Sequence, residues 1–241
     1  MNKITNLAIP YFYIDNYNSS QPAVILNEET SKHIVQVLRM KTGENVNLTD
    51  GKGNLLTAII EDDHKKHCSV KVTNVQFTNA HSRKISIAVS LIKNSSRFEW
   101  FLEKATEIGV SEIIPLICER TEKQKFREDR LQNIVVSAML QSQQSWLPVL
   151  HKPVLFKNVI ESSVHQQKFI AHCIKEEKRN LTDLVNESLN SQIILIGPEG
   201  DFTKDEIDLA IEHHFIPVAL GETRLRTETA AIVASTILKF S

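Results

Sequence analysis

Cysteine is scarce in this chain of 241 residues, which has only Cys68, Cys118 and Cys173. The three cysteines are odd in number and far apart, and no two of them have Cys-x-x-Cys spacing. This pattern argues against a disulfide framework and against a zinc ribbon. We therefore expect reduced thiols, which are typical of the cytoplasm, and no metal site.

Long apolar runs and a large excess of one charge are also missing. No stretch approaches the roughly 20 apolar residues that a membrane-spanning helix needs, and residues 1–14 lack the apolar centre of a signal peptide. The formal net charge is -1, so the chain as a whole is not a polycation, although a local basic face is compatible with that total. We expect a cytoplasmic protein without a membrane partner.

Several catalytic and nucleotide-binding motifs are absent. The turn Gly197-Pro198-Glu199-Gly200 lacks the third glycine of a dinucleotide fingerprint, and no Gly-Lys-Ser or Gly-Lys-Thr follows it as in a P-loop. No His-Glu-x-x-His motif or serine nucleophile elbow occurs. His64, His67 and Cys68 have the side chains of a metal site, but a polar turn between two strands is the favoured interpretation.

Short strands separated by polar turns are typical of the first third of the chain. Residues 24–26, 46–48, 55–60 and 68–72 are expected to form short strands, and one helical piece is expected over residues 28–40. This spacing predicts a small β-barrel or sandwich. The polar stretch 78–84 is the best linker candidate, so we expect one domain over residues 1–76 and a second over residues 77–241.

Strands then alternate with helices, which predicts a mostly parallel α/β sheet. The strand at 85–92 precedes a helix that ends at Gly109, where a left-handed cap residue belongs. The strand at 193–196 runs into the Gly-Pro-Glu-Gly turn, and Thr203 and Glu206 have the spacing of a capping box. Two glycines around a proline let a backbone approach a ligand closely, although a plain strand-to-helix connection explains them equally well.

The last helix is apolar almost all the way round after Thr229, so it must be buried within the domain, against a partner, or both. Arg224, Arg226 and Glu228 alternate immediately before it. Two arginines beside a buried helix favour a phosphate or carboxylate site over a surface cluster of salt bridges.

Two motifs near the carboxyl end resemble those of the RsmE family of 16S ribosomal RNA uridine-N3 methyltransferases, in the SPOUT superfamily. They are Gly-Pro-Glu-Gly-Asp-Phe at residues 197–202 and Leu-Gly-x-x-Arg-Leu-Arg-Thr-Glu-Thr-Ala at residues 220–230. Residues 97–110 are similar to the family's helix-and-turn signature. His33 with residues 37–39 and Gly43 is similar to its amino-terminal signature, so the resemblance spans nearly the whole chain.

The resemblance implies an α/β fold in which a trefoil-knotted methyltransferase domain follows a small PUA-like, RNA-binding β-barrel. It implies a homodimer that binds S-adenosylmethionine in the knot and methylates N3 of a uridine in 16S ribosomal RNA of the small ribosomal subunit. Two alternatives stay open. One is another knotted RNA methyltransferase, for example one acting on a tRNA ribose 2′-hydroxyl, and the other is a non-enzymatic RNA-binding adaptor.

The resemblance also assigns residues to the site. Those expected to bind the cofactor are Leu195, Ile196, Gly197, Pro198, Glu199, Gly200, Leu220, Gly221, Leu225, Arg226 and Thr227. Arg226, with Arg224, is expected to stabilise negative charge developing on a uracil carbonyl oxygen, and Glu199 and Glu228 are weaker candidates for a general base. Plausible RNA contacts are Lys32, His33, Arg39, Lys52, Lys93 and Arg97.

One departure from the family pattern concerns a helix expected over residues 127–144. Leu140 and Gln144 stand where many relatives carry a glutamate and an arginine, which weakens any phosphate contact at position 144. A basic run at positions 120, 123, 125, 127 and 130 offers compensation. Acidic residues are interleaved with it, however, so a solvated helix face is the favoured interpretation.

Overall fold

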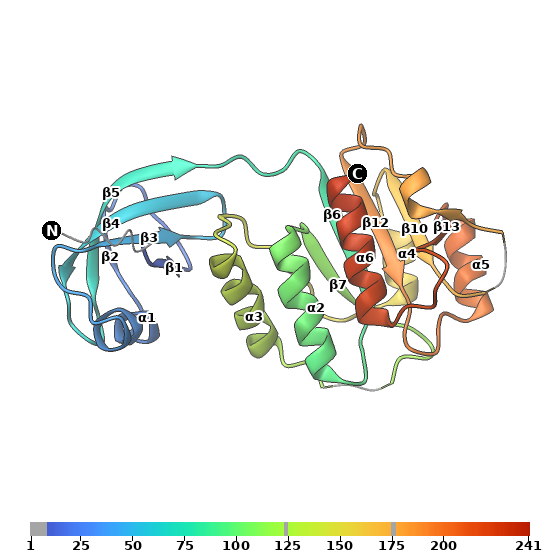
Figure 1. Cartoon of the computed structure of the whole chain (residues 1–241), viewed down its shortest axis with the longest axis horizontal. Coiled ribbons are helices and arrows are strands. Elements are labelled where there is room, and N and C mark those ends of the chain that lie inside the picture. The colour runs from blue at the N-terminus through green and yellow to red at the C-terminus, as the bar shows by residue number, and fades with distance from the viewer. Residues whose placement is uncertain (1–8, 123–124, 175–176) are drawn as a thin grey trace, which may run out of the picture. The chain divides into compact units, whose positions relative to one another are not determined.

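The computed structural model describes residues 9–122, 125–174 and 177–241, which form two compact units (Figure 1). The smaller unit takes in the chain up to Ala80 together with Met139–Leu147, and the larger unit comprises His81–Ala138 and Pro148–Ser241. The two expected domains were continuous segments, so the structure differs in giving Met139–Leu147 to the smaller unit. Lys123, in the basic run, lies outside the described residues.

The smaller unit is built on a five-stranded sheet in the order β1-β3-β4-β5-β2, in which only the β1–β3 pair is parallel. Alternate residues of β4 (Leu56, Ala58 and Ile60) are buried, as expected for a strand with one face on a core. The strands are β1 (Tyr11–Tyr13), β2 (Ala23–Ile25), β3 (Asn45–Thr49), β4 (Asn54–Asp62) and β5 (Ser69–Phe77).

The helical piece of this unit is shorter and less regular than expected. Instead of one helix over residues 28–40, α1 (Glu28–Lys32) continues as a π-helix (His33–Val37), and Arg39 then adopts a left-handed backbone with φ 58°. The widened turn leaves Val37 and Leu38 exposed while Ile34 stays in the core. Side-chain periodicity alone did not reveal this change of helix type.

Backbone hydrogen bonds explain why Met139–Leu147 belongs with the smaller unit. The Leu147 amide donates to the Gly51 carbonyl at 2.8 Å, and the Gly53 amide donates to the Ser145 carbonyl at 2.8 Å. The Tyr11 hydroxyl also donates to the Gln144 carbonyl at 3.1 Å. The segment that departs from the family pattern therefore packs against the small sheet.

The larger unit contains an eight-stranded sheet in which every pair is parallel, as expected. Its order is β11-β13-β10-β12-β6-β7-β8, with β9 also paired to β7. The strands are β6 (Lys84–Ser90), β7 (Glu112–Ile117), β8 (Val149–Leu150), β9 (Val154–Leu155), β10 (Gln167–Ala171), β11 (Arg179–Asn180), β12 (Ser191–Ile196) and β13 (Ile216–Ala219).

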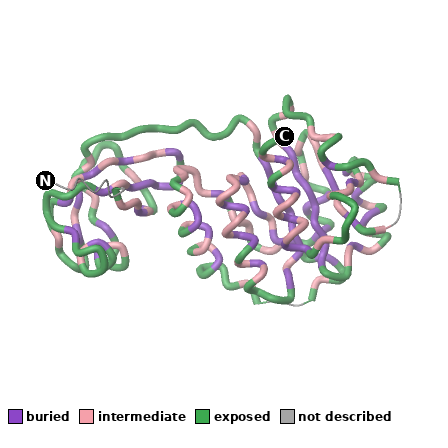
Figure 2. Tube along the Cα trace, viewed as in Figure 1, coloured by how far each residue is buried: buried purple, intermediate pink, exposed green. Residues whose placement is uncertain are grey.

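Helices cover both faces of this sheet. On one face α6 (Thr227–Phe240) lies against β6 and β12 and beside α2 (Ser95–Ile108) (Figure 1). On the other face α4 (Phe156–Ser162) and α5 (Lys204–Glu212) enclose an apolar core with Leu195 and Phe202. The remaining helices are α3 (Glu128–Gln141) and a 3₁₀-helix (Leu181–Asp183). Figure 2 shows that the central strands are buried, as strands with both faces covered must be.

Two local predictions are confirmed. Gly109 ends α2 in the left-handed conformation with φ 86°. The capping box of Thr203 and Glu206 opens α5. None of the helices within the described ranges combines the length and the apolar character needed to cross a membrane.

A polar cluster lies at the amino ends of β6 and β7. The Glu112 carboxylate contacts Lys84 Nζ at 2.6 Å and accepts a hydrogen bond from Ser86 Oγ at 2.8 Å. Ser86 Oγ is also 2.9 Å from His165 Nε2. Burial acts to raise the pKa of Glu112, but the hydrogen bonds from Lys84 and Ser86 outweigh it, so the pKa lies below the ordinary value of 4.5.

We predict that Glu112→Gln lowers the free energy of unfolding at neutral pH but changes it less at acid pH. A carboxylate with a depressed folded-state pKa stabilises the fold above its unfolded pKa, and this contribution is lost as pH falls through the folded pKa. The variant should lose about 1.5–3 kcal/mol at pH 7, in line with a hydrogen-bonded charged group, and the difference from the parent should shrink below pH 4.5. Urea unfolding at several pH values measures both. Glu161→Gln, on a surface ion pair of α4, is the control, and a pH-independent difference at Glu112 contradicts the prediction.

Candidate active site

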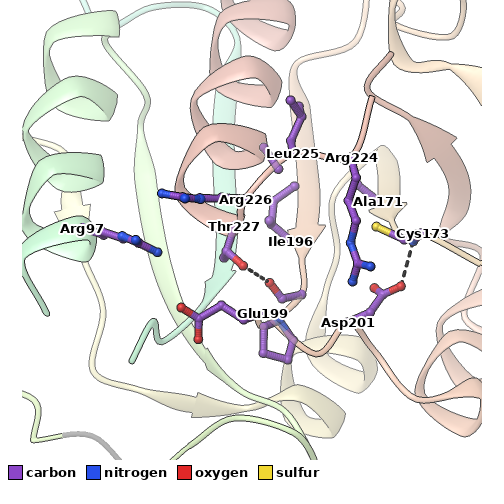
Figure 3. A pocket seen from close by; sticks show the side chains of 13 residues that line it. Arg97, Ala171, Cys173, Ile196, Glu199, Asp201, Arg224, Leu225, Arg226 and Thr227 are labelled. Atoms are coloured by element: carbon purple, nitrogen blue, oxygen red, sulfur yellow. Dashed lines mark hydrogen bonds between the residues drawn. The ribbon is translucent and has the colours of Figure 1, made fainter. Parts of the chain in front are cut away.

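A cavity of about 350 Å³ lies in the larger unit where β10 and β12 end (Figure 3). Its volume falls in the roughly 300–1,000 Å³ range of small-molecule sites, and ligands of parallel sheets bind at the carboxyl ends of strands. Two loops, residues 197–201 and 224–227, supply most of the wall. The lining residues are Arg97, Ala171, Cys173, Ile196, Gly197, Pro198, Glu199, Asp201, Arg224, Leu225, Arg226, Thr227 and Ala230.

Gly197 begins the first loop, and the structure gives a specific reason for glycine there. A Cβ atom at this position would lie 3.1 Å from the Phe202 ring and 3.2 Å from the Phe202 nitrogen. Phe202 is buried in the core beneath the sheet, so it has little room to move away. The sequence left open a close approach of a ligand and a plain strand-to-helix connection, and the structure shows that Gly197 lets the loop fold onto Phe202.

One buried hydrogen bond joins the two loops. Thr227, the first residue of α6, donates from Oγ1 to the Gly197 carbonyl at 3.0 Å. Gly197 directly follows the last residue of β12. The start of α6 is thereby fixed against the end of the strand, and both loops keep the positions that enclose the cavity.

Further hydrogen bonds anchor the first loop to its surroundings. Asp201 accepts from the Cys173 amide at 2.8 Å, which ties the loop to the segment after β10. Arg120 donates to the Gly200 carbonyl at 2.7 Å, and the Glu119 amide donates to Glu206 at 2.9 Å. Neighbouring segments on two sides therefore restrain this loop.

Charged side chains of both signs border the cavity. Arg97, Arg224 and Arg226 contribute three permanent positive charges, and Glu199 and Asp201 contribute two carboxylates. In Figure 3, Arg97 and Arg226 lie on one side of the first loop, and Arg224 lies on the other, near Asp201 and Cys173. The cavity can therefore bind cationic and anionic groups of a ligand at separate points.

Glu228 does not line the cavity, although it neighbours Thr227. Its side chain is only 9% exposed, and its Oε1 atom lies 3.6 Å from Nε of Arg97. Its Oε2 atom is buried and has no hydrogen-bond partner within the described part of the chain. The amino end of α6 favours a negative charge at this place. Glu228 is thus positioned to orient Arg97 through this 3.6 Å contact.

The cavity brings together most of the predicted cofactor residues but not all of them. Ile196, Gly197, Pro198, Glu199, Leu225, Arg226 and Thr227 line it. Leu195 instead faces the core of α4 and α5, because successive residues of a strand point to opposite faces. Gly200 contacts Arg120, and Leu220 and Gly221 lie outside the lining.

Four lining residues were not predicted: Ala171, Cys173, Asp201 and Ala230. Ala171 and Cys173 come from the end of β10, which pairs with β12. The apolar run at residues 169–171 was visible in the sequence as a strand. Its position next to β12 depends on strand order, which the sequence pattern does not contain.

The predicted RNA contacts are distributed over both units. Arg97 lines the cavity, whereas Lys93 pairs with Glu122 at 3.1 Å. The other four lie in the smaller unit. Lys32 pairs with Glu28 at 2.7 Å, and Lys52 Nζ donates to Asn16 at 3.0 Å. The rings of His33 and Phe12 are in a T-shaped arrangement, and Arg39 is exposed.

The histidines of the expected polar turn do not form a metal cluster. The rings of His64 and His67 stack with centroids 3.8 Å apart. Across the described residues, no three His, Cys, Asp or Glu side chains converge in a way that could hold a metal ion.

Both units match known families. The RNA methyltransferase domain family matches residues 79–239, and the RNA methyltransferase PUA domain family matches residues 26–73. A ribosomal RNA small subunit methyltransferase E from Synechocystis sp. is 31% identical over 219 residues, covering 89% of this chain and 72% of that protein.

Solved structures agree. A probable rRNA methyltransferase from Porphyromonas gingivalis has a TM-score of 0.88 and 34% identity, covering 96% of this chain and 98% of that chain. A ribosomal RNA small subunit methyltransferase E from Neisseria gonorrhoeae, bound to S-adenosyl methionine, has a TM-score of 0.84 and 30% identity, covering 94% and 95% of the two chains.

We predict that Thr227→Val destabilises the larger unit. Valine keeps the branched shape but leaves the buried Gly197 carbonyl without its donor, a loss of about 1–3 kcal/mol. Urea unfolding measures the change. Thr227→Ser restores the hydroxyl and should recover most of the lost stability. Equal stability of the valine variant and the parent would show that the hydrogen bond does not hold the loops together.

Proposed function

We propose that this chain, which belongs to the RsmE family of RNA methyltransferases, transfers a methyl group from S-adenosylmethionine to N3 of a uridine in 16S ribosomal RNA. The observation that carries the proposal is the cavity formed where two family motifs are joined by the hydrogen bond from Thr227 to Gly197. The uridine-N3 specificity rests on the resemblance of these motifs to the family.

The cavity fits S-adenosylmethionine in size and chemistry. Ile196, Leu225 and the small Ala171 and Ala230 offer apolar surface for an adenine ring. Gly197 has no side chain and therefore lines the cavity with its backbone. Asp201 already accepts hydrogen bonds from two backbone amides, so Glu199 is the carboxylate left to meet a cationic group. When bound, the cofactor supplies an electrophilic methyl group on a sulfonium.

The arginines can stabilise the charge that forms on the substrate. Removing the proton from uracil N3 spreads negative charge onto the two carbonyl oxygens beside it. Arg226 and Arg97 lie on the same side of the first loop and can donate hydrogen bonds to such oxygens (Figure 3). Glu228 orients Arg97 through the 3.6 Å contact. Preset donors of this kind need little rearrangement during the reaction.

Glu199 is the better placed of the two candidate bases. It lines the cavity and is exposed, whereas Glu228 is buried beside Arg97 and is not part of the lining. A base must come within hydrogen-bond reach of the proton that it removes. The target uridine must also be unpaired or flipped out, because Watson–Crick pairing occupies its N3 edge.

The wider setting also belongs to the proposal: a knotted larger unit, RNA binding by the PUA-like unit, the cytoplasm and the small ribosomal subunit. A homodimer is supported by α6, which leaves Ile232, Val233 and Ile237 half-buried and Phe240 72% exposed in a single chain. Apolar surface of this kind favours packing against a second copy. Light scattering that finds only monomers would contradict this part.

We predict that the purified protein methylates 16S ribosomal RNA from cells that lack this enzyme, at N3 of one uridine. Arg226→Ala should lower kcat about 10²–10³-fold, the usual loss for one charge-stabilising donor. Arg224→Ala, on the other side of the loop, is the matched comparison. Mapping of the labelled nucleotide measures the product.

Two outcomes would redirect the assignment. A methyl group on a ribose 2′-hydroxyl would indicate the other class of knotted enzyme. An absence of both transfer and calorimetric binding of S-adenosylmethionine would indicate an RNA-binding adaptor.

We also predict that S-adenosylmethionine protects Cys173. Cys173 is exposed and lines the cavity, whereas burial raises the pKa of Cys68 to about 11 and that of Cys118 to about 12. A thiol reagent should therefore react quickly with Cys173 alone, because the thiolate is the reactive form. Cofactor at 100 times its Kd should slow this phase about a hundredfold if only free protein reacts. Cys173→Ser should abolish the phase, and full reactivity at saturating cofactor would contradict the assignment.

A further inference from the structure

A second cavity, of about 380 Å³, lies in the larger unit beside the start of α2. At 3.6 residues per turn, Ser95, Ser96, Phe98 and Glu99 fall on one side of this helix and Arg97 on the opposite side. Arg97 lines the first cavity, and the other four line the second. The complete lining is Leu91, Ile92, Ser95, Ser96, Phe98, Glu99, Lys125, Phe126, Arg127, Arg130 and Leu131.

This cavity has an apolar floor and a polar rim. Ile92, Phe98 and Leu131 form the floor and are almost completely buried. Phe126 is half-buried in the wall, so part of it is accessible to a ligand. The first turn of α2 contributes two serines to the rim, together with the positive end of the helix dipole.

The cations around the rim differ in whether they form an ion pair. Arg130 forms a two-pronged ion pair with Glu99, at 2.7 and 2.8 Å, and this contact lowers the pKa of Glu99. Lys125 and Arg127 are exposed and form no ion pair within the described ranges, although the charge of Arg127 also lowers the pKa of Glu99. Arg130 therefore fastens α3 to α2, and two exposed positive charges are left at the rim.

We propose that this second cavity binds a nucleotide of single-stranded substrate RNA, close in sequence to the methylated uridine. The inference rests on the proposed function, because the first cavity takes the target base. An apolar floor with an accessible phenylalanine suits a nucleobase, and Lys125 and Arg127 suit a phosphate. The helix is about 10–12 Å across, so a short stretch of RNA can reach both cavities by crossing the start of α2.

The charge balance favours RNA over a protein partner. The lining holds three cations and a single carboxylate, and that carboxylate is already paired with Arg130. The favoured interpretation of this basic run from the sequence was a solvated helix face. In the structure, Lys125 and Arg127 are exposed, as that interpretation expects, but they precede α3 and also line the second cavity.

The double variant Lys125→Ala/Arg127→Ala tests the phosphate contact. RNA affinity should fall, and the slope of log K against log salt should lessen by about 1.4, because each contact with single-stranded RNA contributes about 0.7. S-adenosylmethionine binding and kcat at saturating RNA should not change. Lys157→Ala/Lys204→Ala removes the same charge from α4 and α5 and is the control. Arg130 and Glu99 stay intact, so the fold is preserved.

Phe126→Ala tests the base contact separately. Loss of one stacking platform should weaken RNA binding at least about fivefold, with the salt slope unchanged because no charge is removed. Equal RNA affinity and slope in the Lys125/Arg127 variant and the control would overturn the proposal. Failure of the proposed function is distinguishable, since the parent protein would then neither bind S-adenosylmethionine nor transfer methyl groups.

Discussion

The hydrogen bond from the Thr227 hydroxyl to the Gly197 carbonyl is the constraint on which the candidate site depends. It joins the first residue of a long helix to the residue that follows a central strand. Both groups are buried, so neither can exchange its partner for water without cost. With this contact fixed, Arg226 and Glu228, the neighbours of Thr227, have fixed directions. Arg226 lines the cavity, and Glu228 contacts Arg97, which lines it too.

The same arrangement separates residues that border the cavity from residues that orient them. Arg97 and Arg226 border the cavity, and Glu228 stays buried beside Arg97. Both carboxylate oxygens of Asp201 accept hydrogen bonds from backbone amides, which restrains the first loop and leaves Glu199 as the accessible carboxylate. A preset polar environment of this type is what a charge-developing methyl transfer requires.

Residues at the start of α2 line both cavities. Opposite sides of its first turns face the two hollows, so a single helix can position a target base and a neighbouring nucleotide. The pair of Arg130 and Glu99 keeps α3 against this helix. Because the two cavities share no lining residue, the proposal predicts that RNA affinity and methyl transfer can be altered independently.

The sequence by itself determined the features that depend on neighbouring residues: the left-handed end of α2 at Gly109, the capping box of α5, the alternation that gives a parallel sheet, and the two motif loops. Only the tertiary structure decided which side chains meet. Ala171 and Cys173 reach the cavity because β10 lies beside β12, and Met139–Leu147 joins the smaller unit through bonds to Gly51 and Gly53. These contacts join residues far apart along the chain, and local periodicity carries no information about strand order.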